Sequence, residues 1–384
     1  GFYAWINSSY PSYVYNRNSQ ATNQNGNNVT GDGAYSNGYK KVALENAYNG
    51  TTFSSNRVMN PKIVATSGTA TTSTGYVYTV YYDSIYEQLR FRYGTVTGTL
   101  ESNNANAISF ADGLGNHGNA NNGSATGYQV IAGTGASGTN TIDGSSSTNA
   151  SRAGEYVAVG VIPSTVASGN GTAGTAVVAW YDASNQRLLF SYNTAPTSTA
   201  NAAQWGTHTK VIDSDFAGWY VDMAVDPDGG IHIAYYGASN GDLKYAYLPS
   251  YTSDAQIATV DSYLSVGTNI SIEVPTAKET VYESDGTTTV SRYVPRISYF
   301  MSAFTKTKYS VRTAYPYKLN AKNEIADGVE NDMFTGNWEV MTVPTDQIPL
   351  DYTIGVGLKK NDSNSDSTLL GYGTKTGLQT AALQ

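Results

Sequence analysis

The chain of 384 residues carries 22 Lys and Arg against 30 Asp and Glu, giving a formal net charge of -8, and it contains no Cys. Nucleic acid is excluded as an expected partner because the chain lacks the basic field that binds phosphates, and the missing Cys exclude disulfide frameworks, thiolate zinc sites and cysteine nucleophiles. No run approaches the roughly 18 apolar residues of a membrane-spanning helix, so no membrane span is predicted.

The remaining composition favours strands joined by turns. The chain has 39 Gly and 32 Tyr, and 14% of its residues are charged while 40% are hydrophobic. Gly, Asn, Ser and Thr disfavour helices and suit turns, and this hydrophobic fraction is enough for a buried core. The first residue is Gly1 and not Met, which indicates that a leader was removed or that the chain is a segment of something longer, and we take either as a sign of processing during export. We therefore expect an all-β protein that is extracellular or at the cell surface.

The first predicted hairpin lies at the N-terminus, where residues 2–6 and 13–15 are rich in aromatic and aliphatic side chains. This composition is typical of strands. Further β-rich stretches follow at residues 62–65, 156–159, 220–225 and 293–297. Each of them precedes another predicted hairpin, so the repeated unit is expected to have three or four strands.

Those later hairpins share a repeated pattern, in which a triplet that ends one strand is followed by an alternating stretch that begins with Leu. The three clear copies are Tyr81-Tyr82-Asp83 with Leu89-Arg90-Phe91-Arg92-Tyr93, Trp180-Tyr181-Asp182 with Leu188-Leu189-Phe190-Ser191-Tyr192, and Tyr235-Tyr236-Gly237 with Leu243-Lys244-Tyr245-Ala246-Tyr247. In each copy the Leu lies 6 positions after the last residue of the triplet. A weaker fourth copy, residues 299–301 with 307–311, has Thr307 in place of the Leu.

Two segments lie outside the clear copies. Between the first two copies, a Gly/Asn/Ser/Thr-rich segment at about 103–151 is interpreted as a long insertion or a missed repeat. Near the C-terminus, residues 353–358 are expected to pair with residues 368–372. The chain therefore holds about six predicted hairpins, counting the degenerate ones at the two ends.

Repeated four-stranded antiparallel units close most simply into a β-propeller, because radial repetition buries both faces of each sheet and hides its edges. The predicted fold is an all-β β-propeller of about six to seven four-stranded antiparallel blades with long loops. In this prediction residues 1–384 form a single domain. A two-sheet sandwich is the alternative, although it would not require the same hairpin to recur at a fixed offset.

One phrase of the third copy carries a family resemblance. Asp226-Pro227-Asp228-Gly229-Gly230-Ile231-His232-Ile233-Ala234-Tyr235-Tyr236, followed by Asn240-Gly241-Asp242-Leu243-Lys244-Tyr245-Ala246, resembles the blades of secreted bacterial β-propellers of the sialidase-like and BNR-repeat type. Weaker copies extend the resemblance from about Lys62 to Tyr315. The resemblance implies a propeller fold, and such propellers serve as hydrolases, lectins and structural modules alike.

For a sialidase-like hydrolase, the resemblance implies three arginines around a substrate carboxylate, a Tyr nucleophile with a Glu partner, and an acid-base Asp. The chain offers several arginines, but no pattern brings three of them together, and the Ser-x-Asp-x-Gly-x-x-Trp turn of those enzymes is missing. We interpret most of the arginines as solvated residues on strand faces. They are Arg90, Arg92, Arg152, Arg187, Arg292, Arg296 and Arg312.

Three kinds of binding or modification site are candidates. Trp205, Trp219 and Trp338 could offer aromatic platforms to a carbohydrate. Asp362, Asn364 and Asp366 place oxygen side chains at alternate positions, as a calcium loop does, although Ser367 replaces the usual Gly. No other metal or cofactor is predicted. Eight Asn-x-Ser/Thr sequons are candidates for glycosylation in exposed loops, at Asn7, Asn28, Asn49, Asn122, Asn149, Asn170, Asn269 and Asn361.

The sequence favours a non-enzymatic extracellular or cell-surface propeller with a structural or adhesive role, glycosylated and able to assemble with itself or with other surface proteins. The warrants are the repeat, the lack of a convergent catalytic set, and a surface poor in the Lys and Glu that oppose association. A lectin-like propeller that binds glycans is the first alternative, and a sialidase-like glycoside hydrolase is the second.

Overall fold

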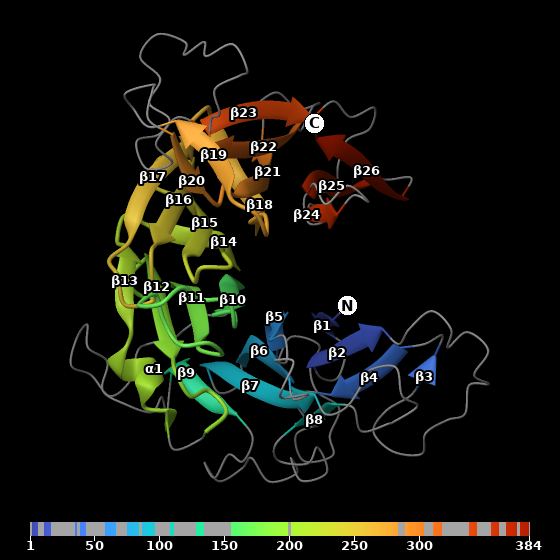
Figure 1. Cartoon of the computed structure of the whole chain (residues 1–384), viewed down its shortest axis with the longest axis vertical. Coiled ribbons are helices and arrows are strands. Elements are labelled where there is room, and N and C mark those ends of the chain that lie inside the picture. The colour runs from blue at the N-terminus through green and yellow to red at the C-terminus, as the bar shows by residue number, and fades with distance from the viewer. Residues whose placement is uncertain are drawn as a thin grey trace. The chain divides into compact units, whose positions relative to one another are not determined.

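The computed structural model describes residues 2–6, 11–16, 35–36, 39–43, 58–66, 75–83, 87–96, 108–110, 128–133, 155–198, 201–282, 289–302, 310–316, 338–343, 355–360, 366–374 and 377–383. These residues form 26 strands and one short helix (Figure 1). The chain divides into two compact units. The first comprises Gly1–Ser164, Thr172–Ser184 and Phe190–Lys210, and the second comprises Thr165–Gly171, Asn185–Leu189 and Val211–Gln384.

The first unit is built from antiparallel sheets. A four-stranded sheet has the order β1-β2-β4-β3, and a five-stranded sheet has the order β5-β6-β7-β8 with β9 also paired to β7. A further four-stranded sheet has the order β10-β11-β12-β13, and its strands β12 and β13 carry residues of both units. The bounds are β1 Phe2–Ile6, β2 Pro11–Asn16, β3 Tyr35–Ser36, β4 Tyr39–Ala43, β5 Val58–Ala65, β6 Gly75–Asp83, β7 Gln88–Val96, β8 Ile108–Phe110, β9 Gln129–Gly133, β10 Val157–Val161, β11 Ala176–Asp182, β12 Arg187–Asn193, α1 Gln204–Thr207 and β13 Lys210–Asp213.

The second unit repeats the four-stranded pattern. Two four-stranded sheets have the orders β14-β15-β16-β17 and β18-β21-β22-β23, and they are accompanied by the hairpin β19-β20 and the three-stranded sheet β24-β25-β26. The bounds are β14 Ala217–Val225, β15 Ile231–Gly237, β16 Asp242–Leu248, β17 Gln256–Asp261, β18 Ser265–Glu273, β19 Glu279–Tyr282, β20 Thr289–Arg292, β21 Arg296–Ser302, β22 Ser310–Pro316, β23 Trp338–Val343, β24 Gly355–Lys360, β25 Asp366–Thr374 and β26 Gly377–Leu383.

The predicted all-β character and the four-stranded antiparallel sheets are confirmed. The N-terminal hairpin pairs β1 with β2, and the predicted C-terminal pairing is that of β24 with β25. The repeated hairpins are β6–β7, β11–β12, β15–β16 and β21–β22. In the part of the chain that the structure describes, no helix has the length and hydropathy needed to cross a membrane.

One sequence prediction needs correction, and a second segment gains detail. The first strand of the fourth repeated sheet is β18, whereas the predicted stretch 293–297 leads into β21. The hairpin β19–β20 lies between β18 and the other strands of its sheet along the chain. Because of this separation, the sequence repeat did not predict β18 as the first strand of the sheet. The segment 103–151, interpreted as an insertion or a missed repeat, contains β8 and β9, and both strands pair with β7.

The fixed offset of the repeat is explained by its turn. The triplet ends one strand, and the residue 4 positions later has a positive φ in all three clear copies: Glu87 at 52°, Gln186 at 54° and Gly241 at 80°. Such a left-handed residue is uncommon outside Gly and Asn. The next strand starts one residue further on, so the Leu after it pairs directly with the middle residue of the triplet, as Leu89 does with Tyr82 and Leu243 with Tyr236.

Within the second unit, each repeat Leu packs on a glycine at the start of the following sheet. A Cβ at Gly218 would lie 3.1 Å from Leu188 Cβ, and a Cβ at Gly267 would lie 3.0 Å from Leu243 Cα. Both glycines have a positive φ, 112° for Gly218 and 100° for Gly267. The backbone of Val266 also donates to the Gly241 carbonyl at 2.9 Å. The repeat therefore fixes how closely one sheet approaches the next.

A second contact between neighbouring sheets of this unit joins a phenol to a carboxylate. Tyr235 donates to Asp213 Oδ2 at 2.8 Å, and Tyr299 donates to Asp261 Oδ2, also at 2.8 Å. Asp213 ends β13 and Asp261 ends β17, and the other carboxylate oxygen of each accepts a backbone N–H two residues on. Tyr235 and Tyr299 are the first residues of their triplets. The repeat tyrosines thus hold the last strand of the preceding sheet.

Tyrosine also fills the core of the second unit. Tyr245 and Tyr299 are fully buried in one cluster with Leu243, Ile272 and Ile297, and the ring of Tyr245 lies 5.0 Å from that of Trp338, edge to face. Such aromatic pairs add to the free energy gained by burying their area. The repeat tyrosines Tyr81, Tyr235 and Tyr245 are core residues, each 0% exposed.

Candidate functional site

The three tryptophans predicted as carbohydrate platforms are all packed against other rings. Trp205 is fully buried, and its indole N–H donates to Gln129 Oε1 at 2.7 Å. Trp338 is only 9% exposed. Trp219 is partly buried, with the ring of Phe216 at 5.5 Å and that of Tyr236 at 6.2 Å. The burial of Trp205 and Trp338 leaves no ring face free for a sugar, because stacking requires an accessible face.

Some of the arginines are buried, although most of them were predicted to lie on solvated strand faces. Arg90 and Arg92 are 0% and 1% exposed, so the prediction is wrong for both. Arg90 forms an ion pair of 2.6 Å with the equally buried Asp83, and its guanidinium lies 3.9 Å from the centre of the Tyr128 ring. Arg296 is bound to Glu279 at 2.7 Å. These arginines serve the packing of the sheets, while Arg152 lies outside the described residues.

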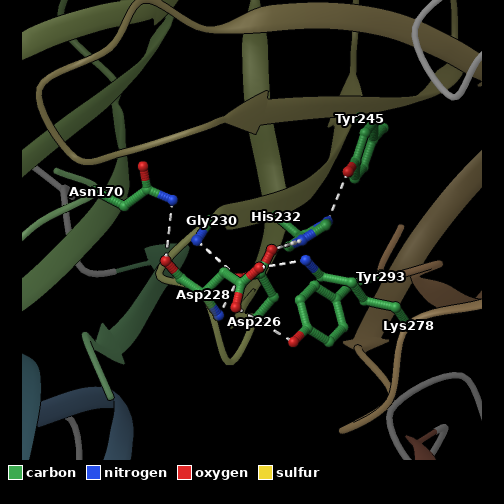
Figure 2. A network of polar contacts seen from close by, with 8 residues as sticks. All are labelled: Asn170, Asp226, Asp228, Gly230, His232, Tyr245, Lys278 and Tyr293. Carbon is green, nitrogen blue, oxygen red and sulfur yellow. Dashed lines mark hydrogen bonds and ion pairs between the residues drawn. The ribbon is translucent and has the colours of Figure 1, made fainter. Parts of the chain in front are cut away.

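The phrase that carried the family resemblance forms a buried polar network in the second unit, at the turn between β14 and β15 (Figure 2). Asp226 Oδ1 accepts the backbone N–H groups of Asp228 at 2.9 Å and Gly230 at 2.8 Å. Asp226 Oδ2 lies 3.2 Å from His232 Nε2, and His232 Nδ1 lies 2.6 Å from Tyr245 Oη. A single ring proton on Nε2 satisfies both contacts, because it donates to the carboxylate while Nδ1 accepts from the phenol.

This row of carboxylate, imidazole and phenol has no exposed nucleophile. Asp226 is 2% exposed, and His232 and Tyr245 are 0% exposed. Burial, followed by the charge of nearby Tyr247 and Asp226, raises the pKa of Tyr245 well above its usual value, so the phenol stays protonated. A Cβ at Gly230 would collide with the Asp226 carboxylate and the Tyr247 hydroxyl. The network therefore fixes the turn, and Gly230 is required there by a close approach.

Two further residues, Lys278 and Tyr293, contact Asp228 at the same turn (Figure 2). Lys278 Nζ lies 2.6 Å from Asp228 Oδ2, and the hydrogen bond to Asp228 raises the pKa of Lys278 above its usual value. Tyr293 donates to Asp228 Oδ1 over 3.4 Å. Lys278 is 42% exposed and Asp228 is 33% exposed. An exposed pair of this kind adds little stability in water.

Two carboxylates, Asp222 and Glu273, lie where the first strands of two sheets in the second unit meet. Asp222 on β14 accepts the backbone N–H of Ile272 on β18 at 3.0 Å. The adjacent Glu273 is exposed at the end of β18, and the protein atoms around its carboxyl group, followed by the negative charge of Asp222, raise its pKa to about 7. Unequal pKa values in two carboxyl groups are a feature of acid-base sites, but they also arise wherever two carboxylates share one edge.

A pocket of about 440 Å³ lies in the first unit. Its walls come from the β5–β6 hairpin, the end of β10, the segment before β11 and the turn after β12. The described residues that line it are all neutral: Ala65, Thr66, Tyr76, Tyr78, Val161, Ile162, Pro163, Ser164, Ala173, Gly174, Thr194, Ala195, Pro196 and Thr197. Its size lies within the range of roughly 300 to 1,000 Å³ of small-molecule sites.

Two tyrosines form one wall of this pocket. Tyr78 is buried and donates to the Gly174 carbonyl at 2.9 Å, and burial, with smaller contributions from Tyr76 and Tyr93, raises its pKa above the usual range. Tyr76 is half-buried, with the ring of Tyr78 stacked at 6.3 Å and the ring of Tyr93 at 6.3 Å, edge to face. Tyr76 therefore offers the pocket an aromatic ring that is held from two sides.

Of the predicted glycosylation sites, two fall on described residues. Asn170 is half-buried, and its amide nitrogen, the atom that would carry a glycan, donates to the Asp228 carbonyl at 3.1 Å. Asn269 lies inside β18 at a register shift, with φ at 51°, and so not in the predicted loop. The remaining sequons lie outside the described residues: Asn7, Asn28, Asn49, Asn122, Asn149 and Asn361.

The calcium prediction is only partly covered by the structure. Asp366 is the first residue of β25, while Asp362 and Asn364 lie outside the described residues. Elsewhere, among the side chains that the structure describes, no group of 3 or more His, Cys, Asp or Glu is arranged to hold a metal ion.

No protein-family model and no curated protein sequence matches the chain. Among solved structures it is similar to a triple arginine-to-alanine mutant of AofleA from Arthrobotrys oligospora, with 8% identity and a TM-score of 0.42, over 100% of this chain and 82% of that chain. It is also similar to the GH93 alpha-L-arabinofuranosidase of Fusarium graminearum, with 6% identity and a TM-score of 0.41, over 84% and 80% of the two chains. The WD40 domain of SCAP from fission yeast follows at 9% identity and a TM-score of 0.32, over 84% and 66%. Likenesses this distant identify no family.

Proposed function

We propose that the chain is a non-enzymatic β-propeller of six or seven blades, with a structural or adhesive role outside the cell or at its surface. The propeller is supported by the recurrence of one packing scheme: four-stranded antiparallel sheets, a repeat Leu on a glycine of the following sheet, and a repeat Tyr on a carboxylate of the preceding one. A contact scheme that repeats from sheet to sheet suits a radial array. It leaves turns and outer strands free for binding.

The non-enzymatic role is supported by how charged side chains are used. Asp83 with Arg90, Asp226 with His232, and Asp213 with Lys244 and Tyr235 are pairs or networks that are largely or fully buried. Each of them joins strands or fixes a turn. Groups of this kind perturb pKa values without being catalytic. The carboxylates of Asp222 and Glu273 are the described pair that best favours the hydrolase alternative.

The observation that carries the adhesive role is an unprotected edge strand. β17 is the last strand of its sheet, and Ile257 at its centre is 42% exposed. Thr259 is exposed on the same face. Edge strands are normally defended by Lys, Pro or bulges, because their unpaired backbone groups accept a strand from another molecule. β17, with the sequence QIATVD, has neither Lys nor Pro, and its one register shift lies at Val260, past Ile257 and Thr259. Tyr263 and Leu264, 60% and 45% exposed, extend this surface.

The proposal predicts that Ile257→Lys weakens self-association. A charge on the edge strand opposes pairing with a second copy, so the apparent association constant should fall at least tenfold. Sedimentation velocity over a concentration series measures it. Ser214→Lys, on the exposed turn after β13, adds the same charge away from β17 and serves as the matched control.

Two results would contradict the proposal. A wild-type chain that stays monomeric at every concentration removes the self-association. Turnover of neutral or acidic aryl glycosides by the wild-type chain, lost in Glu273→Gln, makes it a hydrolase instead.

A further inference from the structure

The contacts that join neighbouring sheets do not account for the neutral pocket of the first unit. Most side chains of the repeat pack between sheets. Tyr76, Ser164 and Thr197, by contrast, lie outside the triplets and line a pocket of about 440 Å³. The repeated contacts between sheets therefore do not explain why these three residues lie together.

Tyr76 is held rigidly at the pocket wall. Its backbone N–H donates to Thr66 Oγ1 at 2.8 Å, and its carbonyl accepts the Thr66 N–H at 2.8 Å. The rings of Tyr78 and Tyr93 brace its own ring. A side chain fixed in this way loses little entropy when a ligand binds, which raises affinity for a given contact area. The partly exposed ring of Tyr76 is therefore a preorganised platform.

The hydroxyl groups around the pocket divide into two sets. Thr66, Tyr78 and Thr194 already bond to protein groups, Thr194 to Gln204 Oε1 at 2.9 Å. Ser164 and Thr197, by contrast, have no protein partner in the part of the chain that the structure describes. A hydroxyl both donates and accepts, so these two residues can bond to alcohol groups of a ligand in either direction.

The lining excludes ionic ligands. The described residues that line the pocket include no Lys, Arg or His that could neutralise a carboxylate, sulfate or phosphate, and no Asp or Glu that could pair with a cation. Desolvating an unpaired charge in such a pocket would cost several kcal/mol. A ligand that suits one aromatic face, several hydroxyls and no charge is a neutral polyhydroxylated molecule. The weakly positive C–H face of a pyranose ring complements the negative face of an aromatic ring.

We propose that the pocket between the β5–β6 hairpin and the turn after β12 binds a neutral saccharide, with Tyr76 stacking on a sugar ring and Ser164 and Thr197 bonding its hydroxyls. This inference deepens the proposed adhesive role and rests on it, because it makes a surface glycan the ligand of the adhesive protein. In this proposal the aromatic platform for the sugar is Tyr76, and not Trp205 or Trp338.

The test is a screen of neutral mono- and oligosaccharides, followed by titration calorimetry with the best binder. We expect Tyr76→Ala to weaken binding at least tenfold and Tyr76→Phe, which keeps the ring, to weaken it less than threefold. Thr197→Trp, which fills the pocket, should abolish binding. Val211→Ala truncates an apolar side chain that is 38% exposed and lies outside the pocket, and it should leave saccharide binding unchanged. Near-ultraviolet circular dichroism checks that each variant is folded.

The inference is overturned if no neutral saccharide binds at millimolar concentration, if an acidic glycan or a Pro-rich peptide binds the pocket in preference, or if Tyr76→Ala and Thr197→Trp bind as well as the wild type. These outcomes leave the sedimentation of Ile257→Lys unchanged. Loss of the saccharide site is therefore distinguishable from failure of the proposed self-association.

Discussion

Replacing Arg90 with Met should lower the free energy of unfolding by about 3–5 kcal/mol, which is typical of removing one partner of a buried ion pair. Arg90 and Asp83 are both 0% exposed and lie 2.6 Å apart, so the variant leaves the Asp83 carboxylate buried without its counter-charge. Arg90 Nε also donates to Gln88 Oε1 at 2.9 Å, and the Arg90→Met variant lacks this hydrogen bond. Urea denaturation followed by fluorescence measures the loss.

Two further variants separate this effect from packing. Lys278→Met removes an exposed cation whose partner, Asp228, is 2.6 Å away and partly exposed, and the variant should lose at most about 1 kcal/mol of stability. The double variant Arg90→Met with Asp83→Leu should recover most of the stability, because two apolar side chains of similar volume need no counter-charge. Equal losses for Arg90→Met and Lys278→Met would show that the pair near Arg90 is solvated.

The second large effect is expected at the glycines that accept the repeat leucines. Gly267→Ala should cost about 1–3 kcal/mol for placing an L-residue at a φ of 100°. It should cost about 1–3 kcal/mol more for the overpacking against Leu243, whose Cα lies 3.0 Å from the new Cβ. Gly218→Ala, against Leu188, should behave in the same way.

The matched control is Gly169→Ala in the same unit. Gly169 has a φ of 91°, and a Cβ there meets no atom within 4 Å, so this variant includes the backbone strain without the contact. The difference between Gly267→Ala and Gly169→Ala in thermal or urea unfolding therefore reports the contact alone. If both variants lose the same stability, the repeat Leu does not set the approach of the two sheets.

The repeat could be predicted from sequence because its residues are close together and its offset is fixed by one turn. Leu243 and Tyr245 alternate along a single strand, and the left-handed residue Gly241 precedes them at a constant distance. The buried arginines could not be predicted from alternation. In a single antiparallel sheet the second face is usually solvated, whereas both faces of β7 are buried here, Leu89 and Phe91 on one face and Arg90 and Arg92 on the other.

Other features depend on contacts that are distant in sequence. The carboxylates of Asp213 and Asp261 follow similar stretches, Val211-Ile212-Asp213-Ser214 and Thr259-Val260-Asp261-Ser262, and this weak similarity was the signal that could have located the phenol–carboxylate contacts. The saccharide pocket had no such signal. Its walls combine segments near residues 65, 76, 162, 174 and 196, and none of these segments is unusual in composition by itself.

Small-angle X-ray scattering of the monomeric chain, separated by in-line size-exclusion chromatography, tests most directly whether the repeated sheets close into one propeller. A single closed body of 384 residues should give a radius of gyration of about 21 Å and a distance distribution with one peak. A clearly larger radius, with a distribution that shows two separate bodies, would contradict the propeller.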